Sequence, residues 1–180
     1  MSQTGTYSKD SINYVLNGGN LEGTQIYGML KVISNYGSTD AGNRANLAVG
    51  ACYMQLKEFD KAIKYLKEFD GNGADQIQSK DYILLGHAYA EKKNNDEALS
   101  YYKKAASCLS DKDAGQKVIA LYNVAEFQFH IGKNKEAIET LQDIRDNHMD
   151  GLVKADAQSP EPAYNIDDVE KFLARLGVTK

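Results

Sequence analysis

One block of sequence occurs three times in the middle of this chain, and it constrains the fold more than any other feature. The three copies are NLAVGACYMQLKEFDKAIKYL, YILLGHAYAEKKNNDEALSYY and LYNVAEFQFHIGKNKEAIETL. In their alignment Gly86 lies 36 residues after Gly50, and Ala125 lies 39 residues after Gly86. A repeat period in this range is typical of stacked helix pairs. The sequence therefore predicts an all-α fold, an α-solenoid of antiparallel helix pairs, with no β-strand.

Small and large residues alternate in the same register in all three copies. Gly50, Gly86 and Ala125 are small in the first helix of each pair, and Ala62, Ala98 and Ala137 are small in the second. Large residues follow each alanine by one helical turn, at Leu66, Tyr102 and Leu141. Two helices can cross closely only where side chains are small, and a larger residue there costs ~1–3 kcal/mol through overpacking. These positions are predicted to hold each pair together.

The flanking sequence divides the chain into further segments. Thr24 is predicted to cap a helix that ends at Gly37, and Asn95 and Asn134 to cap the second helices of repeats two and three. A terminal helix carries Val169, Phe172 and Leu173 on one side, which suits a cap for the open end of a stack. The predicted segments are a mobile N-terminus at 1–10, a helical segment at 11–40, three helix pairs at 41–149, a linker with both prolines at 150–164 and a capping helix at 165–180.

Composition excludes several kinds of function. The net charge of −4 and the absence of a basic stripe argue against nucleic acid as a partner. No apolar stretch reaches the ~20 residues that span a bilayer, and MSQTGTYSKD does not resemble a secretory leader. Either the chain is cytoplasmic, or an anchor precedes it. The spacing of Cys52 and Cys108 matches no metal or redox motif, so both are interpreted as small buried residues.

No catalytic pattern is present in the sequence. His87, His130 and His148 have no cysteine or carboxylate at metal-ligand spacing, so His87 is interpreted as a solvated or groove-lining histidine on a helix. The glycines at 18–23 and 71–73 follow helical segments, and they are predicted to form turns rather than phosphate-binding loops. The chain is therefore predicted not to be an enzyme and to need no cofactor or metal.

The repeated block resembles the tetratricopeptide repeat over about residues 43–146. The resemblance rests on a small residue, a tyrosine three residues later at Tyr53 and Tyr89, a tight turn, an alanine and a large residue four positions on. The sequence departs from the family at its usual early tryptophan, which is absent. The turn glycine of the family is present only as Gly132, and the other two copies have Lys57 and Lys93 there. The third copy has Gln128 in place of the usual tyrosine.

The resemblance implies a peptide-binding groove lined by the first helix of each pair. Leu47 and Ala51 stand where a clamp for a terminal carboxylate would need polar groups, which argues against binding of chaperone tails. A protein or peptide partner is therefore expected on a mixed, mostly apolar surface. The residues carried over to this groove are Arg44, Leu47, Ala51, Met54, Ile83, His87, Ala90, Tyr122, Asn123, Glu126 and Phe129.

Instead of being open to a partner, the groove could be filled by one of two segments of the chain itself. The terminal helix, through Phe172 and its neighbours, or the segment at 24–36 could fill part of the groove, and the chain could then be a structural or self-associating subunit.

The segments KDSINYVLNG, SNYGSTDAGNRA and VEKFLARLG are similar to a bacterial family of tetratricopeptide proteins of the cell envelope. That similarity implies a membrane anchor before Met1 and a periplasm-facing location.

Overall fold

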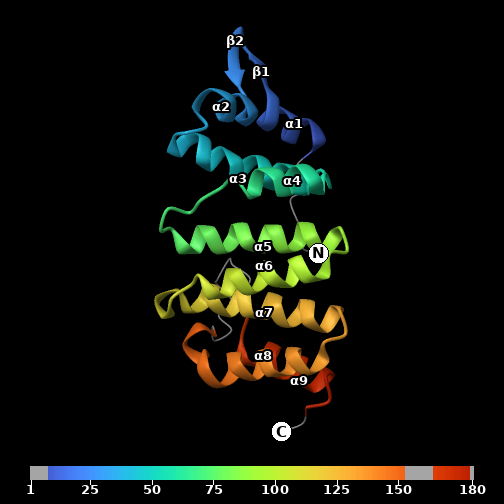
Figure 1. Ribbon diagram of the computed structural model, residues 1–180. Helices are drawn as coiled ribbons and strands as arrows, with labels where there is room; N and C mark the ends of the chain where they lie inside the picture. Colours follow the sequence, from blue (N-terminus) through green and yellow to red (C-terminus); the bar gives the residue numbers. More distant parts are fainter. Residues whose placement is uncertain (1–7, 153–163, 179–180) are drawn as a thin grey trace. The chain divides into compact units, whose positions relative to one another are not determined.

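A computed structural model describes residues 8–152 and 164–178, and it is built almost entirely from antiparallel helix pairs (Figure 1). The predicted α-solenoid is confirmed. By their contacts the residues form two compact units, one of Met1–Asp70 with His87–Lys93, and one of Gly71–Gly86 with Asn94–Lys180. The boundary falls inside the second repeat, and each unit is described by itself.

The first unit begins with a short helix and a β-hairpin. Helix α1 (Lys9–Asn17) is capped by Ser8, whose Oγ accepts the N–H of Ser11 at 3.1 Å. Strands β1 (Gly18–Leu21) and β2 (Thr24–Tyr27) pair antiparallel, and helix α2 (Met29–Tyr36) follows. The prediction of a helix starting at Thr24, in a chain without strands, is therefore wrong.

Local backbone geometry explains this hairpin. Glu22 and Gly23 join the strands with φ of 51° and 83°, and two residues in the left-handed region give the turn that suits a tight hairpin. Gly28 then lies so close to α1 that a Cβ would come within 2.3 Å of the Leu16 carbonyl oxygen. Residues 24–27 pair with β1 and Gly28 is the N-cap of α2, which is why Thr24 does not cap a helix.

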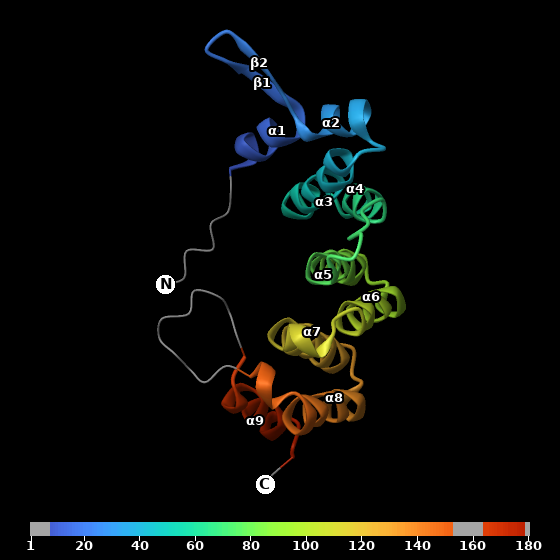
Figure 2. The same cartoon turned by 90° about the vertical axis from the view of Figure 1, so that its left-hand side faces the viewer.

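The first repeat consists of helices α3 (Asp40–Gln55) and α4 (Phe59–Leu66), which lie side by side in Figure 2. Gly50 is buried against Leu66, and a Cβ at Gly50 would lie 2.5 Å from that side chain. Small and large residues therefore meet here as the repeat register predicts. Lys57, in the turn between the helices, has a φ of 60°.

Residues 87–93, in the middle of the second repeat, belong to the same unit. The Nζ of Lys92 forms an ion pair with the Asp60 carboxylate on α4, and the Nζ of Lys67 lies 5.4 Å from the centre of the Tyr89 ring. In the first repeat, the Asn43 side chain on α3 bonds to the backbone of Asp70, which follows α4. Its amide donates to the Asp70 carbonyl at 2.7 Å, and its oxygen accepts the Asp70 N–H at 2.9 Å. These contacts join α3, α4 and residues 87–93 into one unit.

The second unit contains the N-terminal part of α5 (Asp75–Glu91) and all of α6 (Asn95–Ser107). Gly86 is buried against Tyr102, whose ring would lie 2.7 Å from a Cβ at Gly86. Ser79 Oγ donates to the Ala105 carbonyl at 2.8 Å. Gly86 thus lies where the two helices of the second repeat cross closely, as predicted. The cap of α6 is Asn94, one residue before the predicted Asn95, and its Oδ1 accepts the Glu97 N–H.

The third repeat consists of α7 (Ala114–His130) and α8 (Asn134–Asn147), with a short 3₁₀ helix, η1 (Asp111–Asp113), before it. Ala125, Ala137 and Leu141 are all fully buried. Gly132 makes the turn with a φ of 79°, as predicted. Asn134 is the first residue of α8 and not its cap; Lys133 occupies the cap position without a side-chain hydrogen bond.

The terminal helix α9 (Ile166–Arg175) packs on the third repeat. Asn165 caps it in a capping box with Asp168. Val169, Phe172 and Leu173 are buried in one core cluster with residues of α7 and α8, so the predicted apolar side is confirmed. A 3₁₀ helix, η2 (Met149–Gly151), follows α8. Most of the predicted linker, including Pro160 and Pro162, lies outside the described residues.

Candidate functional site

The predicted groove residues of the first repeat lie along one side of α3. Arg44, Leu47 and Met54 follow at helical spacing, and Arg44 is exposed while Leu47 and Met54 are partly exposed. The opposite side of α3 is buried, with Val49 and Tyr53 at 0% and 8% exposure. One side of the helix is therefore buried, and the other leaves an apolar strip with one cation reachable from solvent.

Helix α1 covers one part of this side of α3. Ala51 and Cys52 line a small apolar cavity of about 150 Å³ together with Ile12 and Val15 of α1. Burial raises the pKa of the Cys52 thiol above its ordinary value. A thiol with a raised pKa is mostly protonated and a poor nucleophile. Cys52 is therefore unreactive in an apolar setting, but Cys52 and Cys108 are both partly buried and not fully buried as predicted.

The predicted groove residues of the second repeat, Ile83 and His87, lie in different compact units. Ile83, in the second unit, is partly buried against a small core cluster formed by residues of α6 and α7. His87, in the first unit, has an exposed side chain. Desolvation by nearby atoms lowers the pKa of its imidazole, and the Glu91 carboxylate opposes that shift. His87 is therefore a mostly neutral side chain at neutral pH.

In the third repeat the largest predicted groove aromatic is covered by the C-terminal segment. Tyr122 on α7 is 8% exposed. Its ring stacks on Tyr164 with 3.7 Å between centroids and meets Phe172 of α9 at 5.7 Å. Burial and the nearby Glu126 carboxylate raise the pKa of Tyr122 to about 12. Tyr122 is thus a neutral core residue in this structure.

The other predicted residues of α7 surround the same contact. Phe129 meets Phe172 edge-on at 5.6 Å, and the guanidinium of Arg175 lies 5.6 Å from the centre of the Phe129 ring. The Asn123 amide donates to the Ile119 carbonyl within the helix at 2.8 Å. Desolvation raises the pKa of Glu126, and Arg175 opposes that shift. A partner would reach the buried Tyr122 only after Tyr164 and α9 had moved away, whereas Phe129 is partly exposed.

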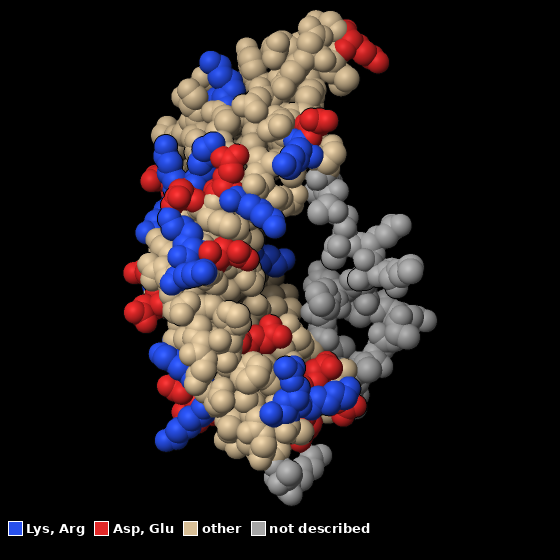
Figure 3. Space-filling view, turned by 90° about the vertical axis from the view of Figure 1, so that its right-hand side faces the viewer, with Lys and Arg blue, Asp and Glu red and all other residues tan. Residues whose placement is uncertain are grey.

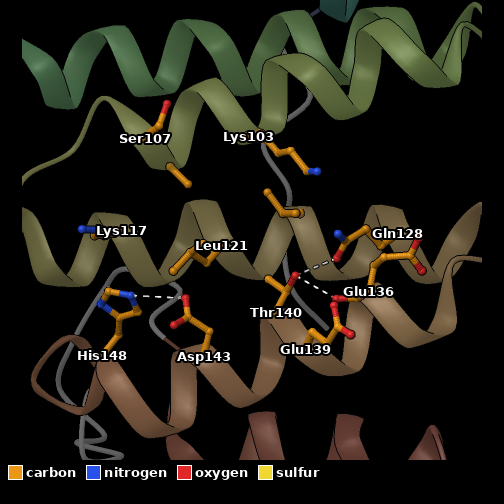
Figure 4. Close-up of a pocket in the computed structure, with 12 residues that line it drawn as sticks. Lys103, Ser107, Lys117, Leu121, Gln128, Glu136, Glu139, Thr140, Asp143 and His148 are labelled. Carbon is orange, nitrogen blue, oxygen red and sulfur yellow. Dashed lines mark hydrogen bonds and ion pairs between the residues drawn. The ribbon is translucent and has the colours of Figure 1, made fainter.

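A larger cavity, of about 510 Å³, opens on the other side of α7, between α6 and α8 (Figure 4). Its apolar lining comes from Ala106, Leu121 and Val124. Its polar lining carries both signs of charge and consists of Lys103, Ser107, Lys117, Gln128, Glu136, Glu139, Thr140, Asp143 and His148. This cavity was not predicted from the sequence. The sequence feature that relates to this cavity is the helical spacing of Leu121, Val124 and Gln128, and the same spacing is typical of residues in an ordinary hydrophobic core.

Hydrogen bonds and ion pairs within the chain already engage much of this polar lining. Thr140 Oγ1 donates to Gln128 Oε1 at 2.8 Å, and His148 Nε2 lies 3.5 Å from the Asp143 carboxylate (Figure 4). Lys117 pairs with Asp111 at 3.2 Å. The buried Gln128, which stands where the family usually has tyrosine, is therefore satisfied by Thr140. The cavity is therefore a cleft of mainly apolar surface between helices, and several of its polar side chains already pair within the chain.

The described residues contain neither a cluster of potential metal ligands nor a helix able to span a membrane. Within residues 8–152 and 164–178, no group of three or more His, Cys, Asp or Glu is placed to hold a metal ion. No helix in the same part of the chain has the length and hydropathy to cross a bilayer. Positive and negative side chains are mixed on the face shown in Figure 3, without a field of one sign.

Comparison with protein families gives a match for each of the three repeats. Residues 44–69 and 82–107 match one family model of the tetratricopeptide repeat, and residues 119–148 match a second model of the same repeat. The matched segments coincide with α3–α4, with α5–α6 and with α7–α8. No curated protein matches the chain as a whole.

Proposed function

Because the chain is a tetratricopeptide repeat protein, we propose that it is a non-catalytic module that binds a segment of a partner protein through the first helices of its repeats. The repeats support protein–protein interaction in general. The finer proposal is that the partner segment lies on the side of α3 that carries Arg44, Leu47 and Met54. In the second repeat the corresponding positions are Ile83 and His87.

The observation that carries this proposal is the combination of exposure and chemistry on α3. Leu47 and Met54 are apolar yet partly exposed, and the exposed Arg44 lies one turn from Leu47. Apolar side chains of a bound segment gain free energy by leaving water, about 25 cal/mol per Å². A cation beside the apolar strip favours an acidic residue in the ligand. The expected partner segment is therefore apolar with an adjacent carboxylate.

Selection from a displayed library of random peptides on the full chain tests this proposal. Recovered peptides are expected to combine apolar residues with Asp or Glu, and isothermal titration calorimetry should give at least tenfold weaker binding to Leu47→Asp and Met54→Asp. Met149→Asp is the matched control, because Met149 is 55% exposed and lies in the other unit. Selected peptides that bind all three variants equally would contradict the proposed surface.

A second candidate function is a structural subunit whose groove is partly filled by its own helices. The burial of Tyr122 beneath Tyr164 and Phe172 favours it for the third repeat. On this alternative, the library should return no peptide that depends on Leu47 or Met54. Substitutions that loosen the cover, such as Tyr164→Ala, should lower thermal stability without creating a binding site.

Location in the bacterial cell envelope forms a separate part of the proposal. It is supported only by the three short segments similar to envelope proteins of this repeat class. Fractionation of source cells with an antibody to the chain tests it. Recovery with the membrane fraction, and protection from protease until the outer permeability barrier is opened, is the expected result. Recovery with the cytoplasmic fraction would contradict it.

A further inference from the structure

Exposed apolar side chains are concentrated at the start of the first unit. Among the described residues, seven of the nine large hydrophobic residues that are exposed lie between Tyr14 and Tyr36. The seven residues are Tyr14, Val15, Leu21, Ile26, Tyr27, Met29 and Tyr36. Single exposed apolar residues are ordinary, but a concentration of them marks an interaction surface. The hairpin β1–β2 supplies the most exposed of them.

The register of the hairpin collects three of these residues on one face. Gly19 pairs with Ile26, and Leu21 pairs with Thr24, so Leu21 and Ile26 lie on the same face. The Tyr14 ring lies against Gly19 on this face, because a Cβ at Gly19 would be 2.8 Å from that ring. Leu21 is 59% exposed. Tyr14, Leu21 and Ile26 therefore form one apolar patch, the hairpin patch.

The strands of this hairpin also have open edges. In the part of the chain that the structure describes, the sheet consists of β1 and β2 alone, and all residues of β2 are exposed. An isolated two-stranded sheet is at best marginally stable. Proteins usually protect open edges with lysine, proline or a bulge. GGNL and TQIY contain no charged residue and no proline, so the edge of β2 is ready to accept another strand.

We propose that the edge of β2 pairs antiparallel with β2 of a second copy of this chain. An antiparallel pair of identical strands satisfies the twofold symmetry of a dimer. The uncharged strands bring no like charges together when they meet. The resulting sheet has four strands, and the hairpin patches of the two copies join into one apolar face. This surface is distinct from the α3 surface of the proposed function.

Sedimentation velocity of the full chain over a range of concentrations tests this proposal. The natural protein is expected to form a dimer. Ile26→Lys, which places a charge in the hairpin patch, and Gln25→Lys, which places one on the edge strand, should each weaken the dimer at least tenfold. Ile77→Lys is the matched control, because Ile77 is 46% exposed outside the hairpin, and this variant should remain dimeric.

A charge-swap mixture separates loss of the interface from loss of the hairpin. In the dimer register proposed here, Gln25 lies opposite Gln25 of the second copy. Gln25→Lys and Gln25→Glu should then each be monomeric alone, and their equimolar mixture should form a heterodimer, because opposite charges meet between the paired strands. Peptides selected on the α3 surface should bind Ile26→Lys with unchanged affinity, so the two proposals fail independently. A monomeric natural protein, a dimer that persists in both hairpin variants, or a mixture that stays monomeric would overturn the proposal.

Discussion

Two lysines occupy backbone conformations that favour glycine. Lys57 and Lys93 have φ of 60° and 59°, and Gly132 makes the equivalent turn of the third repeat with a φ of 79°. A side chain in this region costs ~1–2 kcal/mol per residue, because its Cβ crowds the following carbonyl oxygen. The same two positions are those at which the sequence departs from the glycine usual in the family. All three turns therefore have a positive φ at this position, although two of them have lysine in place of glycine.

Glycine at either turn is therefore expected to stabilise the protein. Lys57→Gly and Lys93→Gly should each raise the free energy of unfolding by roughly 0.5–1 kcal/mol, the relief of strain being partly offset by the entropy of glycine in the unfolded chain. Urea unfolding followed by circular dichroism measures this change. Gly132→Lys should have the opposite sign, and a stabilising effect of that variant would contradict the explanation.

Asp81 is a buried carboxylate at a position where the other repeats have alanine. It is 1% exposed and stands in register with Ala45 and Ala120, which are 3% and 0% exposed. The Gln78 amide donates to its Oδ2 at 3.3 Å, and its Oδ1 has no hydrogen-bond partner. Burial raises the pKa of Asp81 to about 7, although the Gln78 hydrogen bond acts in the opposite direction. The folded protein therefore favours the protonated acid.

This raised pKa predicts a pH-dependent loss of stability. The folded pKa lies above the unfolded value, so the contribution of Asp81 is fully present below pH 3.8 and is lost as the pH rises to about 7. Asp81→Ala should stabilise the protein by up to ~4 kcal/mol at pH 8 and have a much smaller effect near pH 4. Urea titrations at both pH values measure this difference. The exposed Asp150→Ala is the control, and an equal gain at both pH values would contradict the assignment.

At the scale of the elements, close helix crossings depend on two glycines. Gly50→Ala would place a Cβ 2.5 Å from Leu66, and Gly86→Ala one 2.7 Å from the Tyr102 ring. Because both neighbours are buried, each variant should lose ~1–3 kcal/mol of stability. Gly115→Ala on α7 is the matched control, since nothing lies within 4 Å of its Cβ, and it should gain up to ~1 kcal/mol. Calorimetric melting temperatures that fall equally in all three would refute the packing explanation.

Helix α9 is held on the third repeat by its apolar side. Phe172, 4% exposed, contacts Tyr122 and Phe129, and Phe172→Ala should cost ~3–5 kcal/mol. The exposed Lys171→Ala, in the same helix, should change stability by less than ~0.5 kcal/mol. Urea unfolding followed by circular dichroism measures both changes. Similar losses in both variants would indicate that α9 does not depend on its packed side.

At the scale of the whole molecule, α5 belongs to both compact units. Its N-terminal part packs on α6 through Ser79 and Gly86, and residues near its C-terminal end contact α4 through Tyr89 and Lys92. In a repeat array each element is stabilised by its neighbours. Amides of α5 should therefore exchange most slowly with deuterated solvent, and those of the exposed strand β2 most quickly. Mass spectrometry of peptic fragments measures both, and fast exchange throughout α5 would contradict this expectation.

Much of the architecture could be predicted from the sequence because repeats with small residues in register specify local crossings. Gly50 with Leu66 and Gly86 with Tyr102 are such crossings, each within one helix pair. The hairpin could not be predicted in the same way, because Ile26, Met29 and Ile33 also follow helical spacing. The left-handed conformations of Glu22 and Gly23 decide between the two structures. Periodicity alone cannot distinguish short apolar segments.

The sequence by itself determined the helix pairs, the residues that join them, the terminal apolar helix and the repeat class. These properties depend on residue size and spacing within about forty neighbouring positions, which a repeated pattern records. Only the tertiary structure decided that Tyr122 is covered, that Asp81 is buried without a full set of partners and that the hairpin patch is exposed. Whether a side chain is buried depends also on segments outside its own helix pair, since Tyr164 and Phe172, which cover Tyr122, lie 42 and 50 residues after it.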